Sequence, residues 1–193
     1  MSALCSELLH RAILFAAAAH RDQYRKGSQI PYLSHPLSVA LILARLGFDD
    51  EVLAAAVLHD VLEDTPATVE QLRQQFGARV ADLVDWTSET VTDARGGKRP
   101  WEDRKRDKVA KLASAPLEAK ALALADALHN AVATLHELQQ DGPKVWHKFN
   151  APPERRLAHL RALLAACQHD DPRVRRLAEE CQQVLAELEA MPR

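Results

Sequence analysis

Leu53-Ala-Ala-Ala-Val-Leu58 runs directly into His59-Asp60-Val-Leu-Glu63-Asp64-Thr65, and no other stretch of the chain is as informative. The first six residues are apolar at every position, so a helix formed by them is expected to be buried on all sides. An unpaired charge removed from water costs several kcal/mol, so His59 and Asp60 must find a partner. A bound cation is one of the few partners able to hold both.

Two further acids follow within one helical turn. Glu63 lies four residues after His59, and Asp64 lies four residues after Asp60. Residues four apart share a face of a helix. The two acids are therefore predicted to lie one turn beyond the candidate ligands, on the same side.

Helical spacing and cap residues recur along the whole chain, whereas no segment alternates polar and apolar residues as a half-buried strand would. We therefore predict an all-α fold. The expected helices cover residues 3–20, 36–46, 68–76, 78–86, 116–140, 153–169 and 172–190. Another helix is expected to start at Asp49 or Asp50 and to continue past Leu58 into polar last turns, and one more is expected to start at Trp101. The segment 87–100 is expected to be a polar loop.

Length and composition are those of a globular protein: 193 residues, 47% hydrophobic and 27% charged. This length suggests one domain, with a core over residues 3–150 and C-terminal helices over 153–190. The formal charge of −2 gives no excess of positive charge to follow a phosphate backbone, so no nucleic-acid partner is expected. The longest apolar run, Ala12 to Ala19, is far short of the ~20 residues that cross a bilayer. We expect a soluble cytoplasmic protein without a membrane partner.

The cysteines do not indicate a disulfide framework. Cys5, Cys167 and Cys181 are odd in number and widely spaced, and they include no Cys-x-x-Cys pair. A thiolate zinc site is not indicated either.

Two more residues join the candidate ligands. Asp126 follows the apolar run Leu122-Ala-Leu-Ala125, and Lys120 is the only charge in the seven positions before it. His35 is expected in a loop immediately before Pro36. Imidazoles from His35 and His59 with carboxylates from Asp60 and Asp126 make a mixed nitrogen and oxygen set, which suits a divalent first-row metal with positions open for water. Ion pairs and caps would explain each residue singly, but packing alone gives no reason for the whole pattern.

The chain resembles the HD-domain metal phosphohydrolases, and among them the small alarmone hydrolases related to the hydrolase domain of the long stringent-response enzymes. The resemblance implies an HD-type helical bundle. The blocks that carry it are His20-Arg-Asp-Gln-Tyr-Arg-Lys-Gly27, Pro31-Tyr-Leu-Ser-His-Pro36, Leu58-His-Asp-Val-Leu-Glu-Asp-Thr65, Leu124-Ala-Asp-Ala-Leu-His-Asn130 and Trp146 to Asn150.

The resemblance implies a role for each matching residue. His35, His59, Asp60 and Asp126 would bind one metal, usually Mn²⁺, in enzymes that remove the 3′-pyrophosphate from (p)ppGpp-like nucleotides. Glu63 and Asp64 match the catalytic pair. Arg25 and Lys26 match residues that contact the base and phosphates, and Asn130 matches one near the ribose or 3′ group. These are the chemical roles expected of such side chains, since metal lowers the pKa of water and carboxylates move protons.

The chain departs from the family pattern at two positions, where Ala123 and Ala127 replace basic residues. An adenosine alarmone such as (p)ppApp, or another nucleotide with a 3′ or 2′ phosphate, is therefore an alternative substrate. Two other functions stay open: a different HD phosphohydrolase, such as a nucleotidase or phosphodiesterase, and a nucleotide-binding module without catalysis. In each case the partner is a small nucleotide, and the oligomeric state is not predicted.

The start of the helix at Trp101 is basic. Arg104 and Lys105 could reach substrate phosphates, but a solvated helix face is the expected arrangement.

Overall fold

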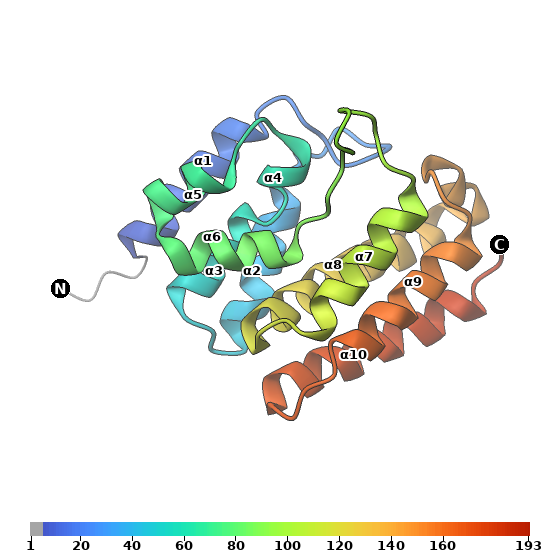
Figure 1. Ribbon diagram of the computed structural model, residues 1–193. Helices are drawn as coiled ribbons and strands as arrows, with labels where there is room; N and C mark the ends of the chain where they lie inside the picture. The colour runs from blue at the N-terminus through green and yellow to red at the C-terminus, as the bar shows by residue number, and fades with distance from the viewer. Residues whose placement is uncertain (1–5) are drawn as a thin grey trace. The chain divides into compact units, whose positions relative to one another are not determined.

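The computed structural model describes residues 6–193 as a set of helices, and the prediction of an all-α fold is confirmed (Figure 1). Over these described residues there is no strand, only an isolated bridge between Tyr24 and Pro31. The helices are α1 (Glu7–Ala19), α2 (Ser34–Arg45), α3 (Asp50–Leu58), α4 (Val61–Asp64), α5 (Val69–Phe76), α6 (Ala78–Thr87), α7 (Trp101–Ala113), α8 (Leu117–Asp141), the 3₁₀-helix η1 (Pro143–Lys148), α9 (Pro153–Ala166) and α10 (Pro172–Ala190). Residues 3–5 of the first predicted helix lie outside the described part.

The chain divides into two compact units, residues 1–97 and residues 98–193. Each unit has its own helix packing and is described by itself. The assignment of the whole chain to one domain stays a prediction.

The first unit is organised around α3, which packs against α1, α2 and α6 (Figure 1). All seven residues from Val52 to Leu58 are buried, as expected from the apolar run. The small or β-branched side chains of residues 54–57 let neighbouring helices approach closely. Leu58, which follows them, is fully buried. Truncating such a leucine to alanine costs about 2–5 kcal/mol, so this helix is fixed firmly.

Side-chain caps set the helix starts of this unit. Asp49 caps α3 by accepting a hydrogen bond from the Val52 N–H at 3.1 Å. Thr68 and Gln71 form a reciprocal capping box at the start of α5. Gly77, with φ of 91°, separates α5 from α6 in a conformation that disfavours other residues. These boundaries match the sequence prediction.

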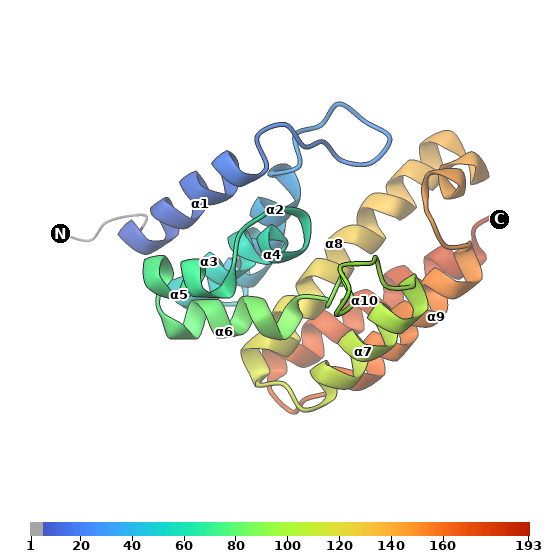
Figure 2. The same cartoon turned by 45° about the horizontal axis from the view of Figure 1, so that its top comes forward.

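The second unit is organised around the long helix α8, which packs against α9, α10 and η1, while α7 packs against α9 (Figure 2). Pro116 precedes α8 and Gly142 ends it with φ of 73°, as the sequence predicts. Residues Ala119 to Ala125 are all buried. Asp126 follows them directly, so the apolar helix fixes where this carboxylate lies along α8.

Three predicted boundaries are wrong in an informative way. His35 is helical, because α2 begins at Ser34, whose hydroxyl donates to the Pro31 carbonyl at 2.8 Å; Pro36 is tolerated within the first turn. The helix expected to reach His169 ends at Ala166, since Asp171 must leave the helix to cap α10.

The third wrong boundary lies within the segment from Leu53 to Thr65. Helix α3 ends at Leu58, and His59 and Asp60 form a turn before the short helix α4. The same-face argument for a continuous helix therefore does not apply to Glu63 and Asp64.

None of the described helices combines the length and the apolar character required to cross a membrane.

The two described thiols are predicted to be unreactive in the folded protein. Burial raises the pKa of Cys167 and of Cys181 to about 12, so at pH 8 only about one thiol in ten thousand is ionised. In a Cys5→Ser variant we expect no reaction with DTNB until the chain is unfolded, and then two equivalents. Rapid reaction of either thiol in the native state would contradict this burial.

Candidate metal centre

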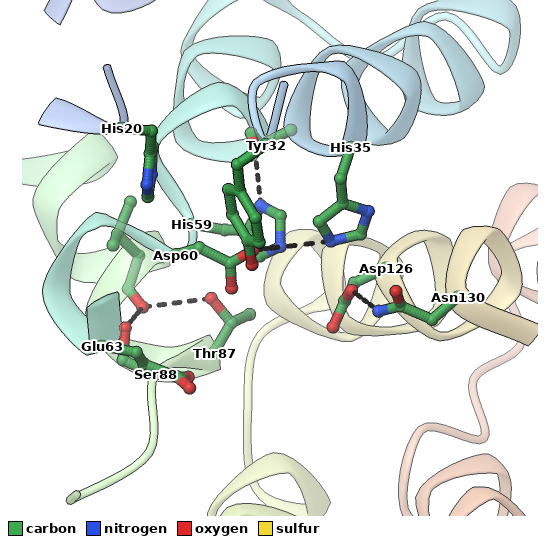
Figure 3. Close-up of polar contacts among 12 residues, drawn as sticks. His20, Tyr32, His35, His59, Asp60, Glu63, Thr87, Ser88, Asp126 and Asn130 are labelled. Carbon is green, nitrogen blue, oxygen red and sulfur yellow. Dashed lines mark hydrogen bonds and ion pairs between the residues drawn. The ribbon is translucent and has the colours of Figure 1, made fainter. Parts of the chain in front are cut away.

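Three side chains of the first unit converge on one carboxylate oxygen (Figure 3). Asp60 Oδ2 lies 3.1 Å from His59 Nε2 and 3.5 Å from His35 Nε2. The same oxygen accepts a hydrogen bond from the Tyr32 hydroxyl at 2.7 Å. His35 and His59 are 1% and 2% exposed. The structure thus brings together three of the four predicted metal ligands within this unit.

The geometry around His59 fits a metal ligand. Its Nδ1 atom lies 2.7 Å from the Ala56 carbonyl oxygen, which can only accept, so Nδ1 carries the proton. In the neutral imidazole Nε2 then presents a lone pair toward the Asp60 carboxylate. Two acceptor atoms at this distance repel one another unless a proton or cation lies between them. Metal-bound histidines commonly donate their second N–H to a carbonyl in this way.

The break between α3 and α4 places these ligand atoms. His59 keeps helical backbone angles, whereas Asp60 has φ of −95° and ψ of −6°. Adjacent side chains on a regular helix diverge by about 100°. Interrupting the helix after Leu58 lets His59 and Asp60 approach the same point, and α4 restarts from the Asp60 carbonyl, which accepts from the Asp64 N–H at 3.0 Å.

The predicted catalytic pair occupies α4, immediately after the ligands. Glu63 Oε1 accepts a hydrogen bond from the Glu89 N–H at 2.9 Å. The pKa of Asp64 is raised above its usual range, chiefly because its carboxyl is partly desolvated and secondly because of the Asp60 carboxylate. The Tyr32 hydroxyl opposes that rise in pKa. Asp64 is therefore predisposed to hold a proton.

The predicted base-contacting residues lie on the segment before α2. The Arg25 guanidinium is 5.8 Å from the centroid of the Tyr32 ring, and Arg25 is half-buried while Lys26 is exposed. The Arg25 N–H donates to the Ile30 carbonyl at 2.8 Å, which closes this segment into a loop. Arg25 is thereby connected to the Asp60 cluster through Tyr32.

The fourth predicted ligand, Asp126, belongs to the second unit. It lies on α8 one turn before Asn130, whose amide donates to Asp126 Oδ1 at 2.6 Å. Figure 3 shows this bond as a dashed line. The pair confirms that Asp126 and Asn130 share a helix face, as their spacing of four indicates.

A cavity of about 290 Å³ within the second unit adjoins this pair. Its polar lining consists mostly of hydrogen-bond donors and cations, with Asp126 as the acid. The lining includes Lys105, Lys108, Asn130, Trp146 and Arg156. On α7, Lys105 is half-buried and lines this cavity together with Trp101 and Lys108, at the spacing that also buries Leu112.

Two donors in this cavity have unusual surroundings. Trp146 is 6% exposed, and its buried indole N–H has no hydrogen-bond partner within residues 6–193. The Arg156 guanidinium stacks on the Phe149 ring, 3.7 Å from its centroid, and burial lowers its pKa to about 10. Arg156 thus remains charged near neutrality while it is largely out of water. These are features of a site that receives an acceptor-rich, anionic group.

Sequence reasoning assigned no role to Tyr32, Lys108 or Arg156. The sequence does mark two of these residues by their positions. Lys108 interrupts the apolar positions of α7 at helical spacing, and Tyr32 stands three residues before His35. Arg156 gave no signal, because only the fold brings Phe149 beneath it.

Comparison with known families matches residues 12–152 to the HD domain. The zebrafish (Danio rerio) protein named guanosine-3′,5′-bis(diphosphate) 3′-pyrophosphohydrolase MESH1 is 38% identical over 149 residues, which cover 76% of this chain and 77% of that protein. The Escherichia coli K12 bifunctional (p)ppGpp synthase/hydrolase SpoT is 50% identical over 80 residues. This match covers 42% of the chain but spans only 11% of the length of SpoT.

Two solved structures are similar to this chain over most of its length. A structure described as a metazoan ortholog of SpoT that hydrolyses ppGpp has a TM-score of 0.74 and 28% identity, covering 94% of this chain and 97% of that one. A Listeria monocytogenes protein has a TM-score of 0.67 and 31% identity, covering 79% of this chain and 99% of that one.

Replacing Tyr32 with phenylalanine is expected to weaken Mn²⁺ binding about 10-fold or more, because the Asp60 carboxylate loses the hydrogen bond that orients it. Isothermal titration calorimetry on metal-free protein measures this change. Tyr24→Phe is the matched control, since Tyr24 is 52% exposed. Equal affinities of the Tyr32→Phe variant and the wild type would show that the hydroxyl does not support the carboxylate.

Proposed function

This chain belongs to the HD domain family, and we propose that it is a metal-dependent hydrolase that removes the 3′-pyrophosphate from an alarmone nucleotide such as (p)ppGpp or (p)ppApp. The products are pyrophosphate and GDP, GTP or the adenosine equivalent. One observation carries the proposal: two buried imidazole nitrogens and a carboxylate oxygen meet at one point, directly before a turn bearing two acids.

We assign the metal to His35, His59, Asp60 and Asp126. The orientation of His59 and its approach to Asp60 support the first three. Asp126 is supported by its isolated place after an apolar helix and by its match to the family motif. Two nitrogens with carboxylate oxygens suit Mn²⁺ or another divalent first-row ion. When bound, such an ion lowers the pKa of water and offsets negative charge on phosphate.

The proton transfers are assigned to α4. Hydrolysis forms a bond from a water oxygen to phosphorus and breaks the bond from phosphorus to the 3′ oxygen. A base must accept the proton of the water, and the leaving 3′ oxygen must gain one. Glu63, held by the Glu89 N–H, is assigned to orient the water and accept its proton. Asp64, with its raised pKa, is assigned to hold the proton that the leaving oxygen receives.

The cavity of the second unit is assigned to the 5′ phosphates of the nucleotide. Phosphate oxygens accept hydrogen bonds, and the cavity offers the Trp146 indole N–H, the Arg156 guanidinium and lysine ammonium groups. Charge-assisted bonds to such groups are about twice as strong as neutral ones. Asn130 is assigned to the sugar or 3′ group, and Arg25 and Lys26 to the base and phosphates.

The two departures from the family pattern have different surroundings. Ala127 lines the cavity, so the lysine or arginine usual in the family would occupy part of it. Ala123 is 1% exposed. Lys108 and Arg156 leave the cavity cationic without the residue at 127. Alanine at position 127 therefore alters the shape of the cavity more than the sign of its charge. Guanosine and adenosine alarmones both remain candidate substrates.

A nucleotide panel with Mn²⁺ tests the function directly. We expect pyrophosphate release from (p)ppGpp, (p)ppApp or both, measured by product chromatography. Asp60→Asn and Asp126→Asn should each reduce turnover about a hundredfold or more, since changes behind metal ligands already cost about 10- to 100-fold. Both variants should also lose bound metal, measured by elemental analysis.

Asp170→Asn is the matched control, because Asp170 is exposed between α9 and α10. Release of inorganic phosphate alone would favour a nucleotidase, and tight nucleotide binding without turnover would favour a binding module. Full activity of either ligand variant would contradict the ligand assignment.

Arg156→Ala is expected to raise KM for a 5′-phosphorylated substrate about 10- to 100-fold with a smaller effect on kcat. The reason is the loss of a buried charged hydrogen bond, worth about 1.5–3 kcal/mol. Arg156→Lys should retain part of the affinity, and the exposed pair residue Arg176 provides the control Arg176→Ala. An equal effect on a substrate without 5′ phosphates would refute this placement of the phosphates.

A further inference from the structure

A third buried imidazole lies beside the Asp60 cluster, and the proposed mechanism does not use it. His20 ends α1 and is 3% exposed. Its ring centroid is 4.9 Å from that of Tyr32, with an interplanar angle of 36°. Figure 3 shows Tyr32 between His20 and His35. His20 therefore supports the Tyr32 ring from the side away from the candidate ligand His35.

The Nδ1 atom of His20 makes a separate contact. It lies 2.7 Å from Gln23 Oε1, while Gln23 Nε2 donates to the Asp64 carbonyl oxygen at 2.8 Å. Because the Gln23 amide nitrogen donates to a carbonyl, its oxygen must face the imidazole. An amide oxygen only accepts, so the proton of His20 resides on Nδ1. The direction of every bond in this chain of three residues is thus determined.

The Asp64 carbonyl needs such support. Helix α4 has only four residues, too few to be stable on internal hydrogen bonds, and its last carbonyls lack partners within the helix. Gln23 caps the end of α4 that carries the catalytic pair. The Tyr32 N–H also donates to the Gln23 carbonyl at 2.9 Å, which ties the two branches together through the backbone.

A merely structural residue would not be a histidine here. The Nε2 atom of His20 is buried and has no hydrogen-bond partner among the described residues 6–193. Leaving a buried polar atom unsatisfied is unfavourable, and a phenyl ring would fill the space without that cost. An aromatic ring and an N–H donor on the same residue are, however, what the two contacts require.

We propose that His20 is a positioning residue of the hydrolytic site, acting through two separable contacts: its ring supports Tyr32 and hence Asp60, and its Nδ1–H orients Gln23 and hence the Asp64 end of α4. The inference rests on the proposed function for its catalytic consequence. Its structural part, the link from His20 to the metal ligand and to α4, is testable without turnover.

The two contacts are separated by two substitutions. His20→Phe keeps a ring and removes the donor. It should bind Mn²⁺ within about 2-fold of the wild type, while kcat at saturating Mn²⁺ falls about 10-fold or more with little change in KM. His20→Asn keeps an amide donor in place of Nδ1 and removes the ring. It should retain kcat at saturating Mn²⁺ within about 3-fold but bind Mn²⁺ about 5- to 10-fold more weakly.

A readout independent of activity separates this inference from the proposed function. Hydrogen exchange measured by mass spectrometry should be faster over residues 61–65 in His20→Phe and in Gln23→Met, and near wild type in His20→Asn. The double variant His20→Phe/Gln23→Met should exchange no faster than either single variant, because both remove the same link. His136→Ala is the matched control, since it removes an exposed histidine–glutamine hydrogen bond to Gln140.

Each outcome decides one point. If the wild type hydrolyses no nucleotide, the proposed function fails, while the exchange and Mn²⁺ measurements still test the role of His20. If His20→Phe leaves the exchange of residues 61–65 unchanged, or His20→Asn binds Mn²⁺ like the wild type, the positioning role is overturned.

Discussion

The Asp60 carboxylate is the point on which the first unit depends. Its Oδ2 atom faces two nearly inaccessible imidazole nitrogens and accepts the Tyr32 hydroxyl. Such a cluster is unfavourable in a protein interior unless positive charge compensates the carboxylate. What keeps it there is the burial of α3, whose seven apolar residues bring His59 inside. The hydrophobic effect thus supplies the free energy that concentrates these polar groups.

The turn that follows Leu58 orients the polar groups that the burial of α3 brings inside. It lets neighbouring ligand atoms reach one point and starts a helix of only four residues that bears Glu63 and Asp64. So short a helix has little stability of its own. Its position is set by contacts from elsewhere in the unit, the Glu89 N–H on Glu63 and the Gln23 amide on Asp64. The proposed ligand Asp60 and the proposed proton carrier Asp64 are therefore both supported from the segment between His20 and Tyr32.

The second unit meets a different requirement. Helix α7 brings the half-buried Lys105 and the buried Lys108 to the cavity, and the Arg156 guanidinium stacks on the Phe149 ring. The buried Trp146 indole N–H, which has no hydrogen-bond partner within residues 6–193, is unfavourable by itself. An anionic acceptor would satisfy this donor, which supports the proposal that the cavity holds the phosphates of a nucleotide. Asp126 and Asn130 are part of the lining of this cavity.

The sequence by itself determined the helical class, most helix boundaries and the identity of the candidate ligands, because burial and capping act over a few neighbouring residues. Thr68, Asp49 and Gly77 mark their helix ends locally, and an acid or histidine after an apolar run is visible without a fold. The tertiary structure decided the break after Leu58, the helical state of His35, and the contacts of Tyr32, His20 and Arg156. Those depend on residues that are far apart along the chain, and a local pattern carries no information about which side chain will lie across a packed interface.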